Sequence, residues 1–118
     1  MNDAERVIRE AYDAFNSRDT GRALALMDPK VEWPNVVDGG VVHGRDGVRH
    51  HWEDVFAASK PRIDVEEVAP RPDGTIAARV HQTVSGPNGE TLSDDRLTHT
   101  FLVVDGCIQR MHVEPRDT

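Results

Sequence analysis

The sequence predicts an α+β domain, with helices in the first half of the chain and an antiparallel sheet in the second. Before Pro61, apolar residues recur at helical spacing in three segments. After Pro61 they occur in long runs rich in Val, Ile and Thr, which are typical of strands. This segregation favours helices packed on an antiparallel sheet. With 118 residues, the chain has the length of one domain, which would span residues 1–118.

Three helices are predicted. The first covers residues 3–17, the second covers 22–27 and the third covers 48–56, and the first and third have their apolar side chains on one stripe. A brief strand, 31–34, and a glycine-containing loop, 35–44, separate the second helix from the third. The candidate N-caps are Asn2 or Asp3 for the first helix, Asp19 or Thr20 for the second and Asp46 for the third.

Four strands follow in succession, and the turns between them predict how they pair. They cover residues 63–68, 75–84, 91–104 and 108–113. A two-residue turn at Asn88-Gly89 would place Ala78 opposite His99 and Gln82 opposite Asp95. Facing residues lie on the same side of a sheet. One side would then be apolar except for three members, Gln82, Asp95 and His99.

A second turn at Asp105-Gly106 would place His99 opposite His112 and Phe101 opposite Arg110. The other side of the sheet would then also be apolar, through Leu102, Val104, Cys107, Met111 and Val113. A sheet with two apolar sides needs a second partner, so we expect a homodimer formed through the sheet. One bulge at Asp105-Gly106 would exchange the two sides of the last strand, which leaves this half of the register open.

Composition excludes several classes of function. The net charge of -7 argues against nucleic-acid binding, which needs a basic surface, and against binding to anionic membranes. No apolar run approaches the roughly 20 residues of a membrane span, and the acidic start does not resemble a signal peptide. The single cysteine, Cys107, cannot form an internal disulfide. We therefore expect a cytoplasmic protein.

The order of elements resembles the nuclear transport factor 2-like (NTF2-like) superfamily, and within it the SnoaL-like group of polyketide cyclases and small bacterial proteins. The resemblance covers nearly the whole chain and rests on residues 11–16, 24–29, 31–33, 44–48 leading into Trp52, and 103–108. It implies a cone-shaped NTF2-like (cystatin-like) fold, in which a curved sheet wraps on three helices around a closed pocket. It also implies a homodimer.

The resemblance does not carry over the catalytic residues of the superfamily's best-known enzymes. Steroid isomerases have their base carboxylate where this chain has Trp33, which cannot take a proton. Their helical tyrosine corresponds to Ala11, and the adjacent Tyr12 would point about 100° away around the helix. Their protonated acid corresponds to residues 98–100. The aspartate–arginine–aspartate set of the related epoxide hydrolases has no match here.

His99 is the main candidate for a catalytic residue. On an apolar face, desolvation would keep the imidazole neutral and able to accept a proton. The resemblance supports this role, because SnoaL-like cyclases and dehydratases use a histidine and an aspartate in such a pocket. Asp95 is the second catalytic candidate, about 13 Å from His99 along the strand. The alternatives are a core histidine bonded to a backbone or hydroxyl group, and a solvated aspartate.

Five further residues are candidates for substrate binding. Trp33 could stack on a flat ligand, although core packing explains this residue nearly as well. Tyr12 could donate a hydrogen bond to a carbonyl, although its hydroxyl could equally reach solvent. His51 borders the interior on its helical stripe, and Gln82 and Phe101 share the predicted face of His99. The histidine spacing predicts no metal site, and no cofactor is expected.

Two kinds of function remain open. One is cofactor-independent acid–base chemistry, such as isomerisation, cyclisation or dehydration of a small apolar molecule, with His99 as general base. The other is a non-catalytic dimer that binds a ligand or another protein. Fold alone does not decide between them.

Overall fold

Helix α1 (Asp3–Asn16) turns its apolar stripe toward the rest of the molecule. The structure, a computed structural model, describes residues 3–35 and 38–114. The buried residues of α1 are Val7, Ile8, Ala11, Tyr12 and Ala14. The helix predicted for residues 3–17 is therefore confirmed to within one residue at its end. Asn2, one of its two candidate caps, lies outside the described residues.

The second helix is shorter than predicted. Helix α2 covers Thr20–Leu24, and its N-cap Asp19 accepts a hydrogen bond from the backbone of Arg22. Met27, predicted as its last residue, instead begins strand β1 (Met27–Pro34). The reason is tertiary: Met27 pairs with Ile108 of the last strand, and the Ile108 amide donates to the Leu26 carbonyl at 2.9 Å. Sheet pairing here overrides helix propensity.

The third helix begins earlier than predicted. Helix α3 covers Gly44–Ala58, so Asp46 lies in its first turn and His43 is the N-cap. Gly44 has a φ of +77°, which allows the chain to turn directly from a strand into the helix. That strand, β2 (Val41–His43), pairs with β1 and occupies the end of the predicted loop.

The remaining strands complete a six-stranded sheet with the order β2-β1-β6-β5-β4-β3. They are β3 (Lys60–Pro70), β4 (Ile76–Ser85), β5 (Thr91–Val104) and β6 (Cys107–Val113). All neighbours are antiparallel except β1 and β6, which are parallel. The predicted α+β fold with an antiparallel sheet is confirmed, and one parallel pair makes the largely antiparallel sheet a mixed one.

The predicted register between β4 and β5 is confirmed, with Ala78 opposite His99 and Gln82 opposite Asp95. The turn that produces it is longer than predicted. The Gly86 amide donates to the Glu90 carbonyl, so the turn holds three residues, 87–89, and not only Asn88-Gly89. A bulge restores the register, because Ser85 pairs with Thr91 and Val84 with Ser93.

The predicted register between β5 and β6 is wrong beyond the turn. Val104 pairs with Cys107 as the Asp105-Gly106 turn requires, but a bulge follows. His99 then faces Val113 and not His112, and Phe101 faces Met111 and not Arg110. The bulge follows the second pair from the turn, Val103 with Ile108, and exchanges the two sides of the strand. Met111 is consequently buried.

This exchange removes the main reason for expecting dimerisation through the sheet. Met111 and Val113 lie on the inner side, not on the outer one. The outer side also carries polar contacts, in which His81 contacts Asp94 and two arginines form ion pairs with glutamates. Homodimerisation therefore stays a prediction.

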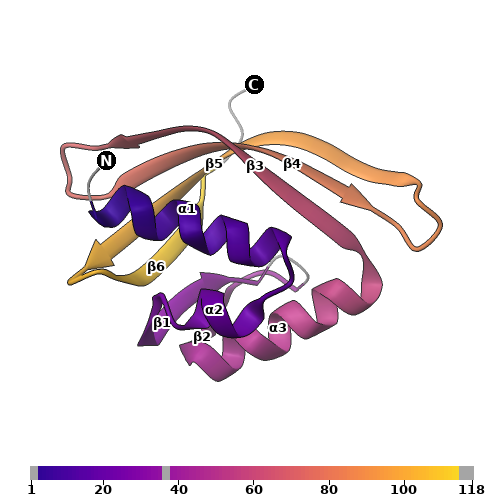
Figure 1. The fold of residues 1–118 in the computed structure, drawn as a ribbon, viewed down its shortest axis with the longest axis horizontal. Helices are drawn as coiled ribbons and strands as arrows, with labels where there is room; N and C mark the ends of the chain where they lie inside the picture. The colour runs from indigo at the N-terminus through magenta and orange to yellow at the C-terminus, as the bar shows by residue number, and fades with distance from the viewer. Residues whose placement is uncertain (1–2, 36–37, 115–118) are drawn as a thin grey trace.

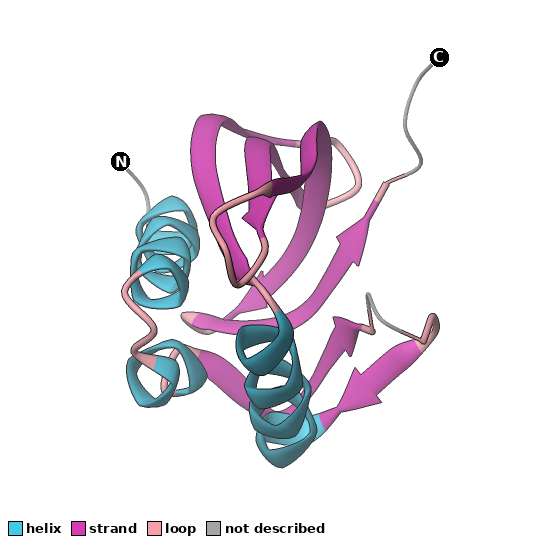
Figure 2. Ribbon diagram, turned by 90° about the vertical axis from the view of Figure 1, so that its right-hand side faces the viewer, coloured by secondary structure: helices cyan, strands magenta, loops and turns pink. Residues whose placement is uncertain are grey.

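Sheet and helices enclose one core. In Figure 1 the long strands arch over α1, and α3 lies against β1 and β2. Figure 2 shows the sheet curling beside the helices. The buried apolar residues come from all three helices and from strands β1, β3, β4, β5 and β6. Within the described part of the chain, no helix is long and apolar enough to cross a membrane.

Candidate functional site

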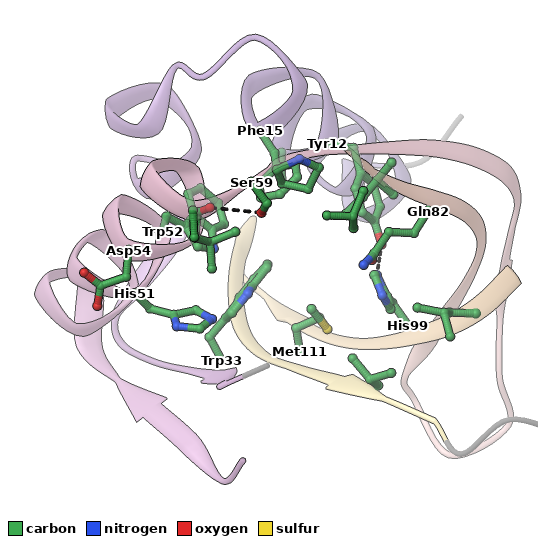
Figure 3. Close-up of a pocket in the computed structure, with 18 of the residues that line it drawn as sticks. Tyr12, Phe15, Trp33, His51, Trp52, Asp54, Ser59, Gln82, His99 and Met111 are labelled. Carbon is green, nitrogen blue, oxygen red and sulfur yellow. Dashed lines mark hydrogen bonds between the residues drawn. The ribbon is translucent and has the colours of Figure 1, made fainter. Parts of the chain in front are cut away.

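A cavity of about 440 Å³ lies between the sheet and helices α1 and α3 (Figure 3). This volume is within the range of roughly 300–1,000 Å³ typical of small-molecule sites. Its lining is mostly apolar and comes from two helices and five strands. The lining residues are Ala11, Tyr12, Phe15, Trp33, His51, Trp52, Asp54, Val55, Ala58, Ser59, Pro61, Ile63, Gln82, Val84, Leu97, His99, Phe101, Met111 and Val113.

Tyr12 and His99 meet at what we call the sheet end of the cavity, defined by Tyr12, Gln82 and His99. The Tyr12 hydroxyl oxygen lies 2.7 Å from Nδ1 of His99, and the two rings stack with centroids 6.0 Å apart. The exposed fractions are only 6% for Tyr12 and 3% for His99. Burial lowers the pKa of His99 to about 4 and raises the pKa of Tyr12 well above its ordinary value. Both side chains are therefore neutral at pH 7.

The surroundings fix the direction of this hydrogen bond. Among the described residues, the Tyr12 hydroxyl has no other partner. If Nδ1 donated, the hydroxyl proton would be buried without an acceptor, at a cost of about 1–3 kcal/mol. Tyr12 therefore donates to Nδ1, and the neutral imidazole carries its proton on Nε2.

The Nε2–H group of His99 is directed to the cavity and not to another protein group. No group in the described ranges accepts a hydrogen bond from Nε2, and Nε2 is not a fully buried, unpaired atom. The amide of Gln82, also at the sheet end, likewise has no hydrogen bond within these ranges. Polar groups of both residues are thus available to a ligand with an oxygen at this end.

Aromatic side chains form the middle of the cavity. Trp33 on β1 and Trp52 on α3 contact each other edge to face, with ring centroids 5.6 Å apart. Phe15 packs on Trp52 and Phe101 packs on Trp33. These are suitable surfaces for a flat apolar ligand. Both tryptophans of the chain line the cavity, so tryptophan fluorescence can report its occupancy.

The opposite, α3 end of the cavity is defined by His51 and Asp54, one helical turn apart on α3 (Figure 3). His51 is buried, and desolvation lowers its pKa, although the carboxylates of Asp54 and Asp38 partly oppose this effect. Asp54 is exposed. Within the part of the chain that the structure describes, no arginine or lysine lines the cavity, so Asp54 brings the only full charge there at neutral pH.

Comparison with known proteins identifies the family. A family model described as a SnoaL-like domain matches residues 8–111. The chain belongs to the SnoaL-like domain family. The resemblance noted in the sequence is thereby confirmed. No protein of curated function matches the sequence of this SnoaL-like domain.

Solved structures share the fold of this SnoaL-like domain. RV0760c from Mycobacterium tuberculosis, in complex with estradiol-17β-hemisuccinate, is 22% identical, with 98% of this chain and 95% of that chain covered and a TM-score of 0.84. TerC, co-crystallised with polyporic acid, is 22% identical, with 96% and 91% covered and a TM-score of 0.84. The Δ5-3-ketosteroid isomerase from Mycobacterium sp. is 20% identical, with 98% and 95% covered and a TM-score of 0.83. At these identities the similarity shows the fold alone.

The cavity of the SnoaL-like domain brings together six of the seven candidate site residues predicted from the sequence. They are Tyr12, Trp33, His51, Gln82, His99 and Phe101. The hydroxyl of Tyr12 does not reach solvent beside the helix, because it bonds His99. Tyr12 is offset by about 100° around the helix from Ala11, the position of the isomerase tyrosine, but its side chain still enters the cavity. Their roles in catalysis or binding stay predictions.

Asp95 is the exception, because it is not among the residues that line the cavity. It pairs with Gln82 in the register but is only half-buried. Met111 and Asp54 are among the lining residues that were not predicted as site residues. Met111 was assigned to the wrong side of β6, and Asp54 is a helical carboxylate that sequence alone does not distinguish from a solvated one. The described ranges hold no cluster of three or more His, Cys, Asp and Glu side chains suited to a metal.

Proposed function

We propose that this protein binds a flat, largely apolar small molecule in the cavity and holds an oxygen atom of that molecule at Nε2–H of His99. The observation that carries the proposal is a donor group with no protein acceptor in the described ranges, on the wall of an otherwise apolar cavity of about 440 Å³. Such a site combines nonspecific apolar contact with one polar group that sets orientation.

The structural neighbours support a ligand of this kind. RV0760c was solved with estradiol-17β-hemisuccinate and TerC with polyporic acid, both of which are ring compounds with oxygen substituents. The rings of Trp33 and Phe101, which contact each other edge to face, would give a planar ligand ring an aromatic surface, and the sheet end would receive its oxygen.

Acid–base catalysis on the bound molecule is the second candidate. A neutral imidazole with a fixed Nε2–H can stabilise negative charge that develops on a substrate oxygen. However, His99 can act as general base only through Nε2 without its proton, which requires the other tautomer. Asp95 does not line the cavity, and the carboxylate of Asp54 lies at the opposite end. Binding is therefore the better-supported function.

The binding experiment uses two probes that differ by one oxygen, estradiol and 3-deoxyestradiol, and follows the fluorescence of Trp33 and Trp52. We expect both to bind, with estradiol tighter by about 2- to 10-fold, the value of one hydrogen bond. The variant Tyr12→Phe should weaken estradiol and leave 3-deoxyestradiol unchanged, since it removes the group that fixes the His99 tautomer. Equal affinity of the two probes, or no binding of either, would contradict the proposal.

Catalysis is tested separately by incubating the protein with a Δ5-3-ketosteroid and recording the absorbance of the conjugated enone. The binding proposal predicts no conversion. Conversion that is lost in His99→Gln would favour the second candidate.

A further inference from the structure

We propose that Asp54 makes the cavity selective for charge: the ligand carries a protonated amine or a neutral donor group at the α3 end, and ligands with a carboxylate there are rejected. This inference rests on the proposed function, because it names the chemistry of the ligand's second end.

The charges on the cavity wall disfavour a ligand carboxylate. Among the described residues that line the cavity, Asp54 is the only one with a full charge at neutral pH, and none is an arginine or a lysine. A ligand carboxylate that enters an apolar cavity loses hydration and needs a cationic partner. The described lining residues offer none, whereas a ligand ammonium would find the carboxylate of Asp54.

Asp54 and Asp38 both contribute to the electrostatic field at the α3 end of the cavity. The carboxylates of Asp54 and Asp38 both act on His51 and oppose the effect of burial on its pKa. Two negative charges therefore reach the buried imidazole at this end of the cavity. Both aspartates are exposed, so solvent and salt reduce their effect, and we expect a modest preference.

Arg18 is a cation close to this region, and its guanidinium is already engaged. It donates to the backbone carbonyls of Phe15 and Pro61 and lies 4.4 Å from the ring centroid of Phe56. It is not a lining residue. Arg18 therefore does not offer a ligand anion the bidentate contact that a carboxylate binder provides.

The two polar ends of the cavity lie on either side of its aromatic middle. Figure 3 shows His51 and Asp54 on one side of Trp33, and Gln82 and His99 on the other. A ligand that lies along the aromatic middle would therefore meet the Nε2–H of His99 with one end and Asp54 with the other. The site favours a molecule with an acceptor oxygen at one end and a cationic or neutral donor at the other.

Three probes with the same ring system test the inference. They are estradiol, its 17β-amino analogue and estradiol-17β-hemisuccinate, whose 17β substituents are neutral, cationic and anionic at pH 7. We expect the amine to bind tightest and the hemisuccinate weakest, with a ratio on the order of tenfold at low salt, because attraction and repulsion each contribute about threefold. The ratio should shrink as salt is raised.

Asp54→Asn should remove most of this ratio, because it removes the carboxylate charge from the cavity wall. The matched control is Glu53→Gln, the neighbouring residue on α3, which removes the same charge but does not line the cavity. Equal effects of the two variants would assign the preference to net charge alone and overturn the inference. Binding of all three probes with equal affinity, or with the hemisuccinate tightest, would also overturn it while the proposed function stands. Failure of all three to bind would overturn both.

Discussion

The hydroxyl of Tyr12 lies 2.7 Å from Nδ1 of His99, so one buried hydrogen bond joins helix α1 to strand β5 inside the cavity. Neither group has a second partner among the described residues. The bond therefore has two consequences. It stabilises the packing of α1 on the sheet, and it determines which imidazole nitrogen is available to a ligand.

Tyr12→Phe should lower the free energy of unfolding by about 1–3 kcal/mol, because Nδ1 of His99 is left buried without a donor. Urea unfolding of the wild type, of Tyr12→Phe, of His99→Leu and of the double variant would form a thermodynamic cycle. We expect the double variant to cost about 1 kcal/mol less than the sum of the single variants. Strict additivity would show that the hydrogen bond contributes nothing to stability.

Stability should also depend on pH through His99. Its pKa is about 4 in the folded protein, against an ordinary value of 6.5 in the unfolded chain, because burial disfavours the charged form. Between these values the unfolded chain binds a proton that the folded protein does not, so the free energy of unfolding rises with pH. The contribution, about 3 kcal/mol, is fully present above pH 6.5 and is lost as pH falls to about 4.

Urea unfolding between pH 4.5 and 7.5 measures this dependence. His99→Gln should flatten the profile, since glutamine can accept from Tyr12 but does not titrate. His50→Gln removes an exposed histidine on α3 and serves as the matched control. His51, whose pKa burial also lowers, adds to the slope in the same direction and is unchanged in both variants. Parallel profiles for the wild type and His99→Gln would rule out His99 as the source.

The two hairpins show how far the sequence determines the sheet. Between β4 and β5 the turn is one residue longer than Asn88-Gly89 predicts, but a bulge at Leu92 cancels the difference, and the predicted face survives. Between β5 and β6 the turn is as predicted, but a bulge next to it has no compensating partner, and the face of β6 is exchanged. Turn chemistry is local, whereas bulges follow from the packing of side chains on both faces.

The same distinction between local turns and longer-range packing explains which residues of the site could be predicted from the sequence. His99 and Gln82 were placed correctly because their face depends only on the register of β4 and β5. Met111 was missed because its face depends on the bulge in β6. The contact between Tyr12 and His99 could not be predicted, since the residues are 87 positions apart and the angle at which α1 lies on the sheet is set by tertiary packing.

Asn16, the last residue of α1, should be essential to the edge of the sheet. Its side-chain amide donates to the Ile63 carbonyl at 2.7 Å and accepts from the Ile63 amide at 2.9 Å, as a neighbouring strand would. Ile63 lies on the edge strand β3 and lines the cavity. Asn16→Ala should therefore lower the free energy of unfolding by about 1–3 kcal/mol, because two partly buried backbone groups lose their partner.

Thermal or urea unfolding would measure this loss. Asn16→Asp keeps the acceptor but removes the donor, so it should also be destabilising. Ser17→Ala, at an exposed neighbouring position, is the control and should change stability by less than about 0.5 kcal/mol. A loss in Asn16→Ala no larger than in the control would show that water replaces the amide at no cost.

The cavity itself can be filled from β4. Val84 lines the cavity, and the preceding Thr83 does not, because side chains alternate along a strand. Val84→Trp should reduce the affinity for estradiol by at least about fivefold, since the indole occupies space that the ligand needs. The variant should change the unfolding free energy by less than about 1 kcal/mol, because the indole fills empty volume. Isothermal titration calorimetry avoids interference from the added tryptophan. Thr83→Trp should leave the affinity unchanged. If Val84→Trp binds estradiol as the wild type does, the ligand occupies a site other than this cavity.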